Sequence, residues 1–292
     1  MTGKVSLPDL VDLHVHSRAS DGMLAPRDVV RMASEMGLRA VAVTDHDTVA
    51  GVPEALAAGE EFGIEVIPAV EISTEFADGA CHILGYFIDI QDAALGALLA
   101  EAREGRERRN AQMLEKLAAL GMPLAMDDVR RHVTAGVVTR AHFASAMIEK
   151  GYVASWDEAF EKFLGRDKAA FVYRKRLDPF EAIRAVRGAG GLPALGHPRQ
   201  LNRTVEETET WIAELARAGL DAVETTSPDH GAALGKRYRK IAERLGLLET
   251  GGTDWHGHEH NAGFSIGVGK GAMRVRYAVV EKMKQRLAAR GA

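Results

Sequence analysis

The chain has 292 residues, 46% of them hydrophobic, which is enough for one barrel-sized domain with an insertion or for two ordinary domains. Its formal net charge of −4 excludes the global basic surface that holds long nucleic acid, so no long duplex partner is expected. A single cysteine, Cys81, excludes an internal disulfide, and the lack of a signal-peptide pattern or of ~20 consecutive apolar residues favours a cytoplasmic protein without a membrane partner.

The first part of the chain alternates short apolar runs with helical patterns. Strands are expected at 10–15, 38–44 and 64–72, with helices at 26–36 and 49–62. Gly37 and Gly63 stand just past the two helices, where a left-handed backbone is needed. This alternation of strand and helix indicates a parallel sheet.

Residues 94–177 show helical patterns without a convincing strand between them. A long charged helix is expected at 94–119, followed by shorter helices near 127–133, 139–150 and 155–163. The interleaved acids and bases at 101–109 indicate exposed ion pairs, so this part of the long helix is not expected to contact a ligand. We predict an inserted helical cap, the substrate-binding domain, at 94–177.

The strand and helix rhythm resumes after Asp178. Strands are expected at 192–195, 220–225 and 247–250, and helices at 179–189, near 206–218, up to 245 and at about 275–289. The fold class is therefore α/β, with residues 1–93 and 178–292 together forming a β/α barrel.

The strongest chemical feature is the sequence Asp-Leu-His-Val-His at 12–16. Because side chains alternate along a strand, His14 and His16 are expected on one face, near the carboxyl end of the first strand. Further residues of ligand type occupy comparable places: Asp21, His46, Glu71, His82, His197, Asp254 and His256. In a parallel barrel the carboxyl ends of the strands form one rim, so these residues are expected to converge.

Each of these histidines, taken alone, is more often a surface or hydrogen-bonded core residue than a metal ligand. Their recurrence at six strand ends favours a metal site. Imidazole nitrogens mixed with carboxylate oxygens, without thiolates, suit Mn, Fe or Zn, and the carboxylates favour the harder ions. Cys81 is expected to pack in the core.

The motifs together resemble the PHP (polymerase and histidinol phosphatase) family, and specifically its stand-alone group that contains nucleoside 3′,5′-bisphosphate phosphatase and a related 5′-3′ exoribonuclease. The matching elements are Asp-Leu-His14-Val-His16-Ser, Ser-Asp21-Gly, Thr-Asp-His46-Asp, Glu71, His82, Gly-His197-Pro and Gly-Thr-Asp254-Trp-His256. The resemblance covers nearly the whole chain and implies a distorted, TIM-like barrel of seven β/α units, the PHP fold, with a helical cap.

The resemblance also implies three metals, two of them bridged by Glu71. The implied ligand sets are His14, His16, Glu71 and Asp254 for the first metal, Glu71, His82 and His197 for the second, and Asp21, His46 and His256 for the third. Many family members have a histidine where Asp21 stands, and serines where Thr253 and Trp255 stand. The cofactors expected are two or three divalent metals, Mn foremost, with Fe or Zn as alternatives.

Two metals about 3.5–4 Å apart activate a shared water and neutralise phosphate oxygens, so a metal-bridging hydroxide is expected to hydrolyse a phosphate ester. The residues expected to take part in catalysis are Glu71, Asp254 and His230. His230 follows the strand at 220–225 and is the candidate for protonating the leaving oxygen or binding phosphate. The alternative for His230 is a solvated loop histidine.

Basic residues of the cap are expected to select the substrate. The sequence Thr-Arg-Ala-His-Phe around Arg140 resembles a motif of the subgroup, and a guanidinium suits a second phosphate. Arg199 and Lys168 are weaker candidates, and Lys168 belongs to a locally basic run, 168–176, of a kind that is usually a solvated face. The predicted partner is a small phosphorylated nucleotide, a nucleoside 3′,5′-bisphosphate, whose 3′-phosphate is released to leave a 5′-mononucleotide.

Three further functions stay open. The same metals cut short RNA from its 5′ end if the cap tolerates a longer strand. The second is hydrolysis of a C–N bond, because metal-dependent amidohydrolases have the same barrel and the same His-x-His motif on the first strand. Such enzymes normally need a carboxylated lysine or a simpler set of metals. A catalytically inactive, nucleotide-sensing module is the third, and the complete ligand set argues against it. The sequence does not predict the oligomeric state.

Overall fold

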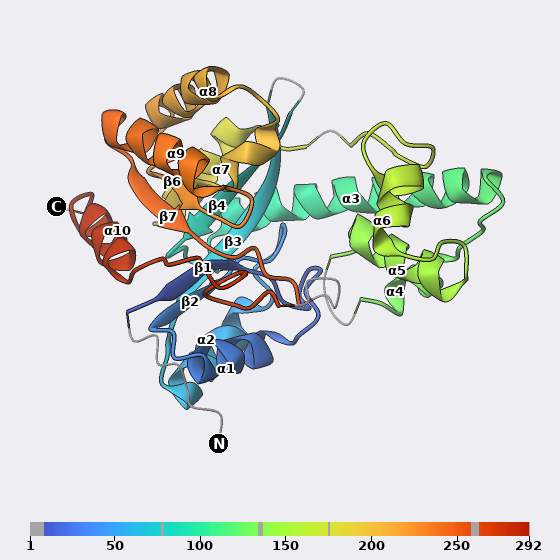
Figure 1. The fold of residues 1–292 in the computed structure, drawn as a ribbon, viewed down its shortest axis with the longest axis horizontal. Coiled ribbons are helices and arrows are strands. Elements are labelled where there is room, and N and C mark those ends of the chain that lie inside the picture. The colour runs from blue at the N-terminus through green and yellow to red at the C-terminus, as the bar shows by residue number, and fades with distance from the viewer. Residues whose placement is uncertain (1–8, 77–78, 134–136, 175, 258–262, 292) are drawn as a thin grey trace.

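The computed structural model describes residues 9–76, 79–133, 137–174, 176–257 and 263–291. Its centre is a seven-stranded sheet whose strands lie side by side in chain order (Figure 1). The strands are β1 (Val11–Val15), β2 (Ala40–Val43), β3 (Glu65–Phe76), β4 (Gly79–Tyr86), β5 (Leu192–Leu195), β6 (Ala222–Thr226) and β7 (Leu248–Gly251). Trp255, just past β7, forms a parallel bridge with Val15, so the sheet curls into a nearly closed barrel. The predicted α/β barrel is confirmed.

Helices lie against the outside of the barrel, where the strand and helix alternation predicted them (Figure 1). They are α1 (Pro26–Glu35), α2 (Val52–Phe62), α7 (Pro179–Gly188), α8 (Val205–Arg217), α9 (Ala232–Arg244) and α10 (Ala278–Ala288). Gly63 ends α2 with a φ of 68°, a left-handed conformation that favours glycine. None of the helices in the described ranges is both long and apolar enough to cross a membrane.

The barrel is not parallel throughout, and the prediction of a wholly parallel sheet was wrong at β4. This strand runs antiparallel to both β3 and β5. Only two residues separate Phe76 from Gly79, so β3 and β4 form a hairpin, whereas a parallel pair needs a crossover of a dozen residues or more. Because β4 is reversed, its first half lies at the rim where the parallel strands end. His82 therefore reaches the rim from near the start of its strand.

Alternate residues along the strands face the inside of the barrel. Ile67 and Ala69 of β3 and Leu84 and Tyr86 of β4 belong to one buried cluster with residues of β1, β2, β5 and β6. The intervening residues pack against the surrounding helices in other clusters. With a side-chain period of two, the next inward positions towards the rim are Glu71 on β3 and His82 on β4. The core pattern thus leads directly to polar side chains at one end of the barrel.

A group of helices extends to one side of the barrel (Figure 1). It comprises the outer part of α3 (Ala93–Ala119), then α4 (Met126–Arg130), α5 (Arg140–Glu149), α6 (Trp156–Ala159) and the π-helical turn η1 (Phe160–Leu164). We call this group the helical segment. It has its own buried cluster, which includes Met113 and Phe143, whereas Leu95 and Leu99 at the start of α3 pack with the barrel core. The division into a barrel and a cap domain, with boundaries at 93 and 178, stays a prediction.

The close packing of Gly252, just after β7, against His14 of β1 predicts the effect of one substitution. A Cβ added to Gly252 would overlap the backbone nitrogen of His14, so the backbone would have to shift. We expect Gly252→Ala to lower the free energy of unfolding by about 1–3 kcal/mol, as overpacking of a core does. Urea unfolding followed by circular dichroism measures the change.

The matched control is Gly96→Ala. Gly96 lies in α3, and nothing lies within 4 Å of an added Cβ. Alanine is the better helix former, so this variant should be as stable as the wild type or slightly more so. If Gly252→Ala is as stable as Gly96→Ala, Gly252 is not packed as closely against His14 as the structure indicates.

Candidate metal centre

The residues predicted to bind metal meet at one rim of the barrel. They come from the strands themselves or from the loops that follow β1, β2, β5 and β7. His14 lies in β1, Glu71 in β3 and His82 in β4, while His46 follows β2 and His197 follows β5. Asp21, His16, Asp254 and His256 come from the loops after β1 and β7. Residues from His14 to His256 are therefore neighbours in space although they are far apart in the sequence.

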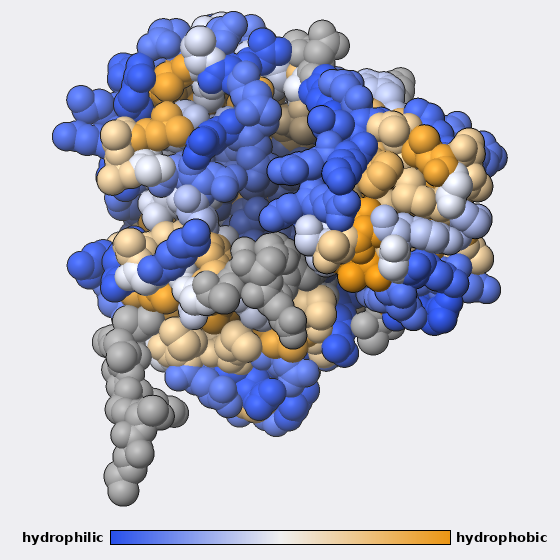
Figure 2. Space-filling view, turned by 45° about the vertical axis from the view of Figure 1, so that its right-hand side comes forward, coloured by the Kyte–Doolittle hydropathy of each residue, from blue (hydrophilic) through white to orange (hydrophobic). Residues whose placement is uncertain are grey.

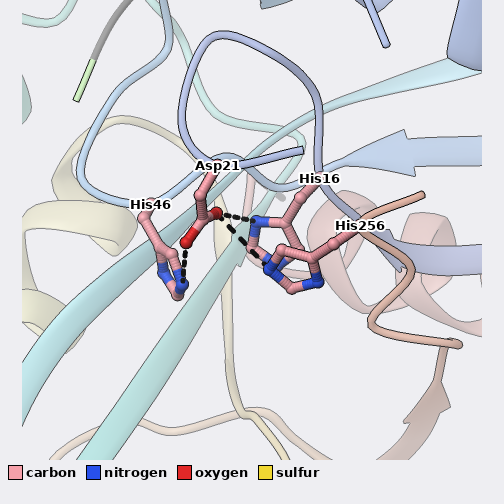
Figure 3. Close-up of side chains that lie close together, drawn as sticks. All are labelled: His16, Asp21, His46 and His256. Atoms are coloured by element: carbon pink, nitrogen blue, oxygen red, sulfur yellow. Dashed lines mark ion pairs between the residues drawn. The ribbon is translucent and has the colours of Figure 1, made fainter. Parts of the chain in front are cut away.

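Three overlapping groups each bring ligand atoms within 4.8 Å of one another. The groups are His14, His16, Glu71 and Asp254; His16, Asp21, His46 and His256; and His46, Glu71 and His82. Figure 3 shows the second group, in which the carboxylate of Asp21 lies between the ring of His46 and the rings of His16 and His256. Its oxygens lie 3.4 Å from Nε2 of His256 and 3.8 Å from Nε2 of His46.

Glu71 lies at the centre of these groups and is fully buried. Its Oε1 lies 2.6 Å from Nδ1 of His82 and 2.9 Å from Nε2 of His197. Its Oε2 lies 2.9 Å from Nδ1 of His46 and 3.2 Å from Nε2 of His16. The two oxygens thus face different sets of histidines, which is the arrangement needed for a carboxylate to bridge two cations.

Opposite charges stabilise one another in this buried site. Burial disfavours ionisation of Glu71, but the histidines around it, His46 and His82 first, hold the pKa of this carboxyl well below its usual range. Burial likewise lowers the pKa of His16, but the carboxylates of Asp254 and Glu71, 3.0 and 3.2 Å from its Nε2, outweigh this effect and raise that pKa to about 10. The charges of Glu71 and His16 therefore depend on their neighbours, whereas burial lowers the pKa of His82 to about 4.

Several buried atoms of the cluster form no hydrogen bond with another described residue. Nε2 of His14, Nε2 of His16, Nδ1 of His46 and Oε2 of Glu71 are buried and have no hydrogen-bond partner among the described residues. Leaving a buried polar atom unsatisfied costs about 1–3 kcal/mol. All four belong to the predicted ligand set, and their lone pairs converge. Imidazole and carboxylate donors in this arrangement fit divalent metal ions.

Two buried aspartates that were not predicted as site residues stabilise the loops of the rim by accepting hydrogen bonds. Asp12 accepts hydrogen bonds from the backbone nitrogen and Oγ1 of Thr253, at 2.9 and 2.6 Å, and from the nitrogen of Gly267 at 2.7 Å. Asp45 accepts from Oγ of Ser17 and Oγ of Ser20, both at 2.6 Å. These bonds fix the chain on either side of the ligands. Thr253, where the family often has serine, serves as a hydroxyl donor.

Glu224 on β6 is a further residue that the sequence pattern did not reveal. It is fully buried, with Oε1 3.2 Å from Nδ1 of His14. Its Oε2 accepts a hydrogen bond from the backbone nitrogen of His197 at 2.5 Å. His197 has a φ of 23°, which is unfavourable for a residue other than glycine, so Glu224 stabilises a strained backbone as well as orienting a ring. A glutamate inside the short apolar strand Ala-Val-Glu-Thr-Thr is the signal that could have revealed it.

A cleft of about 620 Å³ opens between the rim and the helical segment. Asp21, His46 and His82 line one side of it, and Arg140 and Phe160 line the other. In Figure 2, hydrophilic side chains gather around the hollow between the two parts of the molecule. The cleft therefore joins the candidate metal centre to a wall from the helical segment.

The four residues predicted to bind substrate are not all at this cleft. Arg140 lines it, as expected. Arg199 is exposed, and its Nη1 donates to the backbone oxygen of Asp229 at 2.7 Å. Lys168 is also exposed and is not among the lining residues. His230 is buried with its ring 4.9 Å from that of Tyr238, and it too is outside the lining, whereas Lys175 lies outside the described residues.

The long helix α3 contributes more to the cleft than its sequence indicated. The expected exposed ion pairs exist, as between Arg108 and Glu104 at 3.6 Å. Arg106 and Arg109, however, are buried and line the cleft, so this stretch is not wholly exposed. The expectation that it contacts no ligand stays a prediction. One face of the helix is covered by the barrel and by the chain near residue 174. Because charged residues occur on all sides of the helix, the sequence does not indicate which face is covered.

Curated relatives are similar to the chain over most of its length. A 5′-3′ exoribonuclease from Haemophilus influenzae is 35% identical over 245 residues, which cover 84% of this chain and 89% of the relative. A 3′,5′-nucleoside bisphosphate phosphatase from Chromobacterium violaceum is 33% identical over 247 residues, covering 84% and 87%. A phosphoribosyl 1,2-cyclic phosphate 1,2-diphosphodiesterase from Eggerthella lenta is 31% identical over 253 residues, covering 84% and 94%.

Solved structures share the fold. A protein from Chromobacterium violaceum described as an amidohydrolase, with bound sulfate and no metal, matches with a TM-score of 0.86 and 30% identity, covering 94% of this chain and 96% of that chain. A protein from Bifidobacterium adolescentis, solved as a candidate metal-dependent phosphoesterase, matches with a TM-score of 0.84 and 30% identity over the same shares.

A nearly closed seven-stranded barrel with histidines and carboxylates at one rim, in a chain whose relatives cleave phosphate esters, defines a metal-dependent phosphoesterase. The protein is a phosphoric ester hydrolase. The model of the PHP domain family matches residues 12–161, and the chain belongs to this family. The resemblance found in the sequence motifs is thereby confirmed.

Glu224 generates a prediction about metal binding. Glu224→Gln keeps the volume of the side chain but removes the charge that orients His14. We expect the affinity for Mn²⁺ to fall about 10- to 100-fold, the usual cost of changing a group that hydrogen-bonds a metal ligand. Titration of Mn²⁺ against a competing chelator measures it. The control is Glu249→Gln on the neighbouring strand β7, whose side chain is 38% exposed and pairs with Arg239. Equal affinity in both variants would contradict the role given to Glu224.

Proposed function

We propose that the protein hydrolyses the 3′-phosphate of nucleoside 3′,5′-bisphosphates, giving a 5′-mononucleotide and phosphate. The observation that carries the proposal is the single cleft that joins the metal-ligand cluster to buried arginines. Such a cleft suits a substrate with one phosphate at the cations and a second anionic group held farther away. The relative from Chromobacterium violaceum is named for this reaction.

The nine predicted ligands would hold two or three divalent cations, with Mn²⁺ foremost. When bound, such cations supply an activated water and neutralise the oxygens of the phosphate. Glu71 faces histidines on two sides and would fix the spacing of two cations, while Asp254 lies 3.0 Å from Nε2 of His16 and completes the first group. The carboxylate of Asp21 favours a hard ion in the remaining group.

The wall of the cleft suits a nucleotide better than a simple phosphate ester. The guanidinium of Arg140 lies 5.8 Å from the ring centre of Phe160 and 5.9 Å from that of Phe171, and its Nη1 donates to the oxygen of Leu164 at 3.1 Å. These contacts hold a cation in a defined direction. Phe160, Phe171 and Tyr173 all line the cleft, and aromatic faces of this kind stack with bases.

His230 is proposed to protonate the leaving oxygen or to bind phosphate, with Arg199 and Lys168 as secondary contacts to the substrate. The observations behind these three are weaker than for Arg140, since none of them lines the cleft. Burial lowers the pKa of His230, so its ring is mainly neutral at neutral pH. A neutral imidazole can still donate one hydrogen bond to a phosphate oxygen or to the leaving group.

A second candidate is removal of nucleotides from the 5′ ends of short RNA. The relative from Haemophilus influenzae carries that name, and the cleft continues over the barrel surface at Gln200 and Arg203, where a longer chain has room. Turnover of adenosine 3′,5′-bisphosphate against a five-nucleotide RNA and a ribose cyclic phosphate separates the candidates. Faster turnover of the RNA would replace the bisphosphate proposal.

Hydrolysis of a C–N bond and a role as an inactive nucleotide-sensing module gain less support. A site with a carboxylated lysine needs a lysine near the ligands, and none occurs among the described residues that line the cleft. An inactive module has no need of a full set of ligands with unsatisfied lone pairs.

The metal-ligand assignment predicts that His14→Ala or Glu71→Ala abolishes phosphate release while the barrel stays folded, because these side chains bind at the rim and do not fill the core. Phosphate release and thermal unfolding are measured together. His132→Ala, a partly exposed residue of the helical segment that pairs with Glu149, is the control and should keep full activity. Wild-type turnover in either rim variant would refute the assignment.

The role proposed for Arg140 predicts a difference between substrates. Arg140→Ala removes a charge-assisted contact worth about 1.5–3 kcal/mol, so KM for the bisphosphate should rise roughly 10- to 100-fold. Hydrolysis of an aryl phosphate, which lacks the second phosphate, should suffer much less. Equal losses on both substrates would show that Arg140 supports the fold and does not select the substrate.

A further inference from the structure

Arg109 on α3 is a buried cation with unused hydrogen-bonding capacity. It is 8% exposed, and it lines the cleft. Nε donates to Oδ1 of Asn110 at 2.9 Å, but Nη2 has no hydrogen-bond partner among the residues that the structure describes. An unpaired buried charge is costly, because desolvation removes the hydration that stabilised it. A buried guanidinium with an unsatisfied donor therefore indicates that a bound anion supplies the missing contact.

The charges around Arg109 make its position more costly still. After burial itself, the groups that lower the pKa of Arg109 are Arg106, Arg140, Arg174 and Arg176, all of them cations. Together they hold this pKa well below its usual range. A guanidinium does not give up its proton in practice, so the repulsion has to be balanced by negative charge.

The protein supplies little of that negative charge. Arg106 pairs with Asp47 at 2.7 Å and donates to Oγ of Ser73 at 2.7 Å. The same Asp47 lies 3.8 Å from Arg174, so one carboxylate is shared between two guanidiniums. Among the described residues, neither Arg109 nor Arg140 forms an ion pair with a carboxylate, and the largest influences on the pKa of each are burial and other arginines. The arginines of this wall therefore carry an excess of positive charge.

We propose that Arg109, flanked by Arg106, Arg140 and Arg174, forms a phosphate-binding site distinct from the metal-ligand cluster, and that it holds the phosphate of the substrate that is not hydrolysed. A phosphate dianion offers several oxygens to donors that converge from different directions, which suits a group of guanidiniums. The assignment of this phosphate to a substrate rests on the proposed function. In a nucleoside bisphosphate it is the 5′-phosphate.

This inference makes Arg109 the main anchor, with Arg140 beside it. Arg140 already donates to Leu164 and lies between two aromatic rings, so part of its capacity is used. Arg109 lines the same cleft and retains a donor, Nη2, that has no hydrogen-bond partner among the described residues. Arg109 is therefore the arginine of this wall that most needs an anionic partner, although the sequence pattern predicted that it would be exposed to solvent.

The test is a calorimetric titration of inorganic phosphate into protein freed of metals with a chelator. Arg109→Met keeps the length of the side chain and removes its charge. The control is Arg108→Met, the preceding residue of α3, whose side chain is 69% exposed. We expect wild type and Arg108→Met to bind phosphate equally. Arg109→Met should bind it at least about tenfold more weakly, since 1.4 kcal/mol, about the weakest charge-assisted hydrogen bond, corresponds to a factor of ten.

A melting temperature measured without phosphate shows whether the variant folds. Replacing an unpaired buried charge by an apolar side chain is neutral or stabilising, so Arg109→Met should melt at the wild-type temperature or above it, and addition of phosphate should raise that temperature less than it does for the wild type. Phosphate affinity in Arg109→Met equal to that of the wild type would overturn the proposal. The titration involves no turnover, so failure of the bisphosphatase activity would leave its result unaffected.

Discussion

The candidate metal centre depends on one buried carboxylate, Glu71, whose charge is stabilised by the histidines that the neighbouring strands and loops place around it. Glu71 has no exposed surface, and its two oxygens lie within 3.5 Å of nitrogens on five histidines. Desolvation disfavours the ionised form of a buried carboxylate, and the histidines around Glu71, His46 and His82 first, outweigh that effect. Only a barrel that brings β1, β2, β4 and β5 around β3 can provide them. The fold and the site are therefore one electrostatic arrangement.

Much of this arrangement could be predicted from the sequence, because it depends on local patterns. The alternation of apolar runs and helices predicted the strands to within a few residues, and the expected range of 192–195 is the range of β5 in the structure, Leu192–Leu195. The recurrence of histidines and acids at strand ends predicted that nine residues would meet. Strand direction, in contrast, has no signature in a single strand. The reversal of β4 depends on the hairpin with β3 and was missed.

The residues that sequence reasoning missed are those whose role depends on tertiary burial. Arg106 and Arg109 are part of a helix with charges on every side, and nothing in that pattern distinguishes the covered face from the solvated one. Glu224 resembles an ordinary polar residue in a strand until β6 is placed beside His14 and His197. Conversely, Arg199 and Lys168 follow a motif or lie in a basic run, yet neither is part of the lining of the cleft. The position of a residue on the barrel therefore indicates whether it lines the cleft better than its closeness to a motif in the sequence does.

The two sides of the cleft have different origins in the chain. The cations are assigned to residues at strand ends, which a barrel holds rigidly, whereas the arginines come from α3, α5 and the chain near residue 174. Relatives at 31–35% identity are named for three different phosphoester reactions. The same family therefore includes proteins named for different substrates, since fold alone does not fix function.

The hydrogen bonds of Asp12 have a consequence for the synthesis of the protein. This residue near the start of the chain is tied to Thr253, 241 positions later, and Asp254 and His256 follow at once. A ribosome makes the first pair of histidines early and the last ligands only near the end. The nascent chain therefore spends most of its synthesis with an incomplete set of the predicted ligands, and under this assignment the full site forms only when the final strand emerges and the barrel closes.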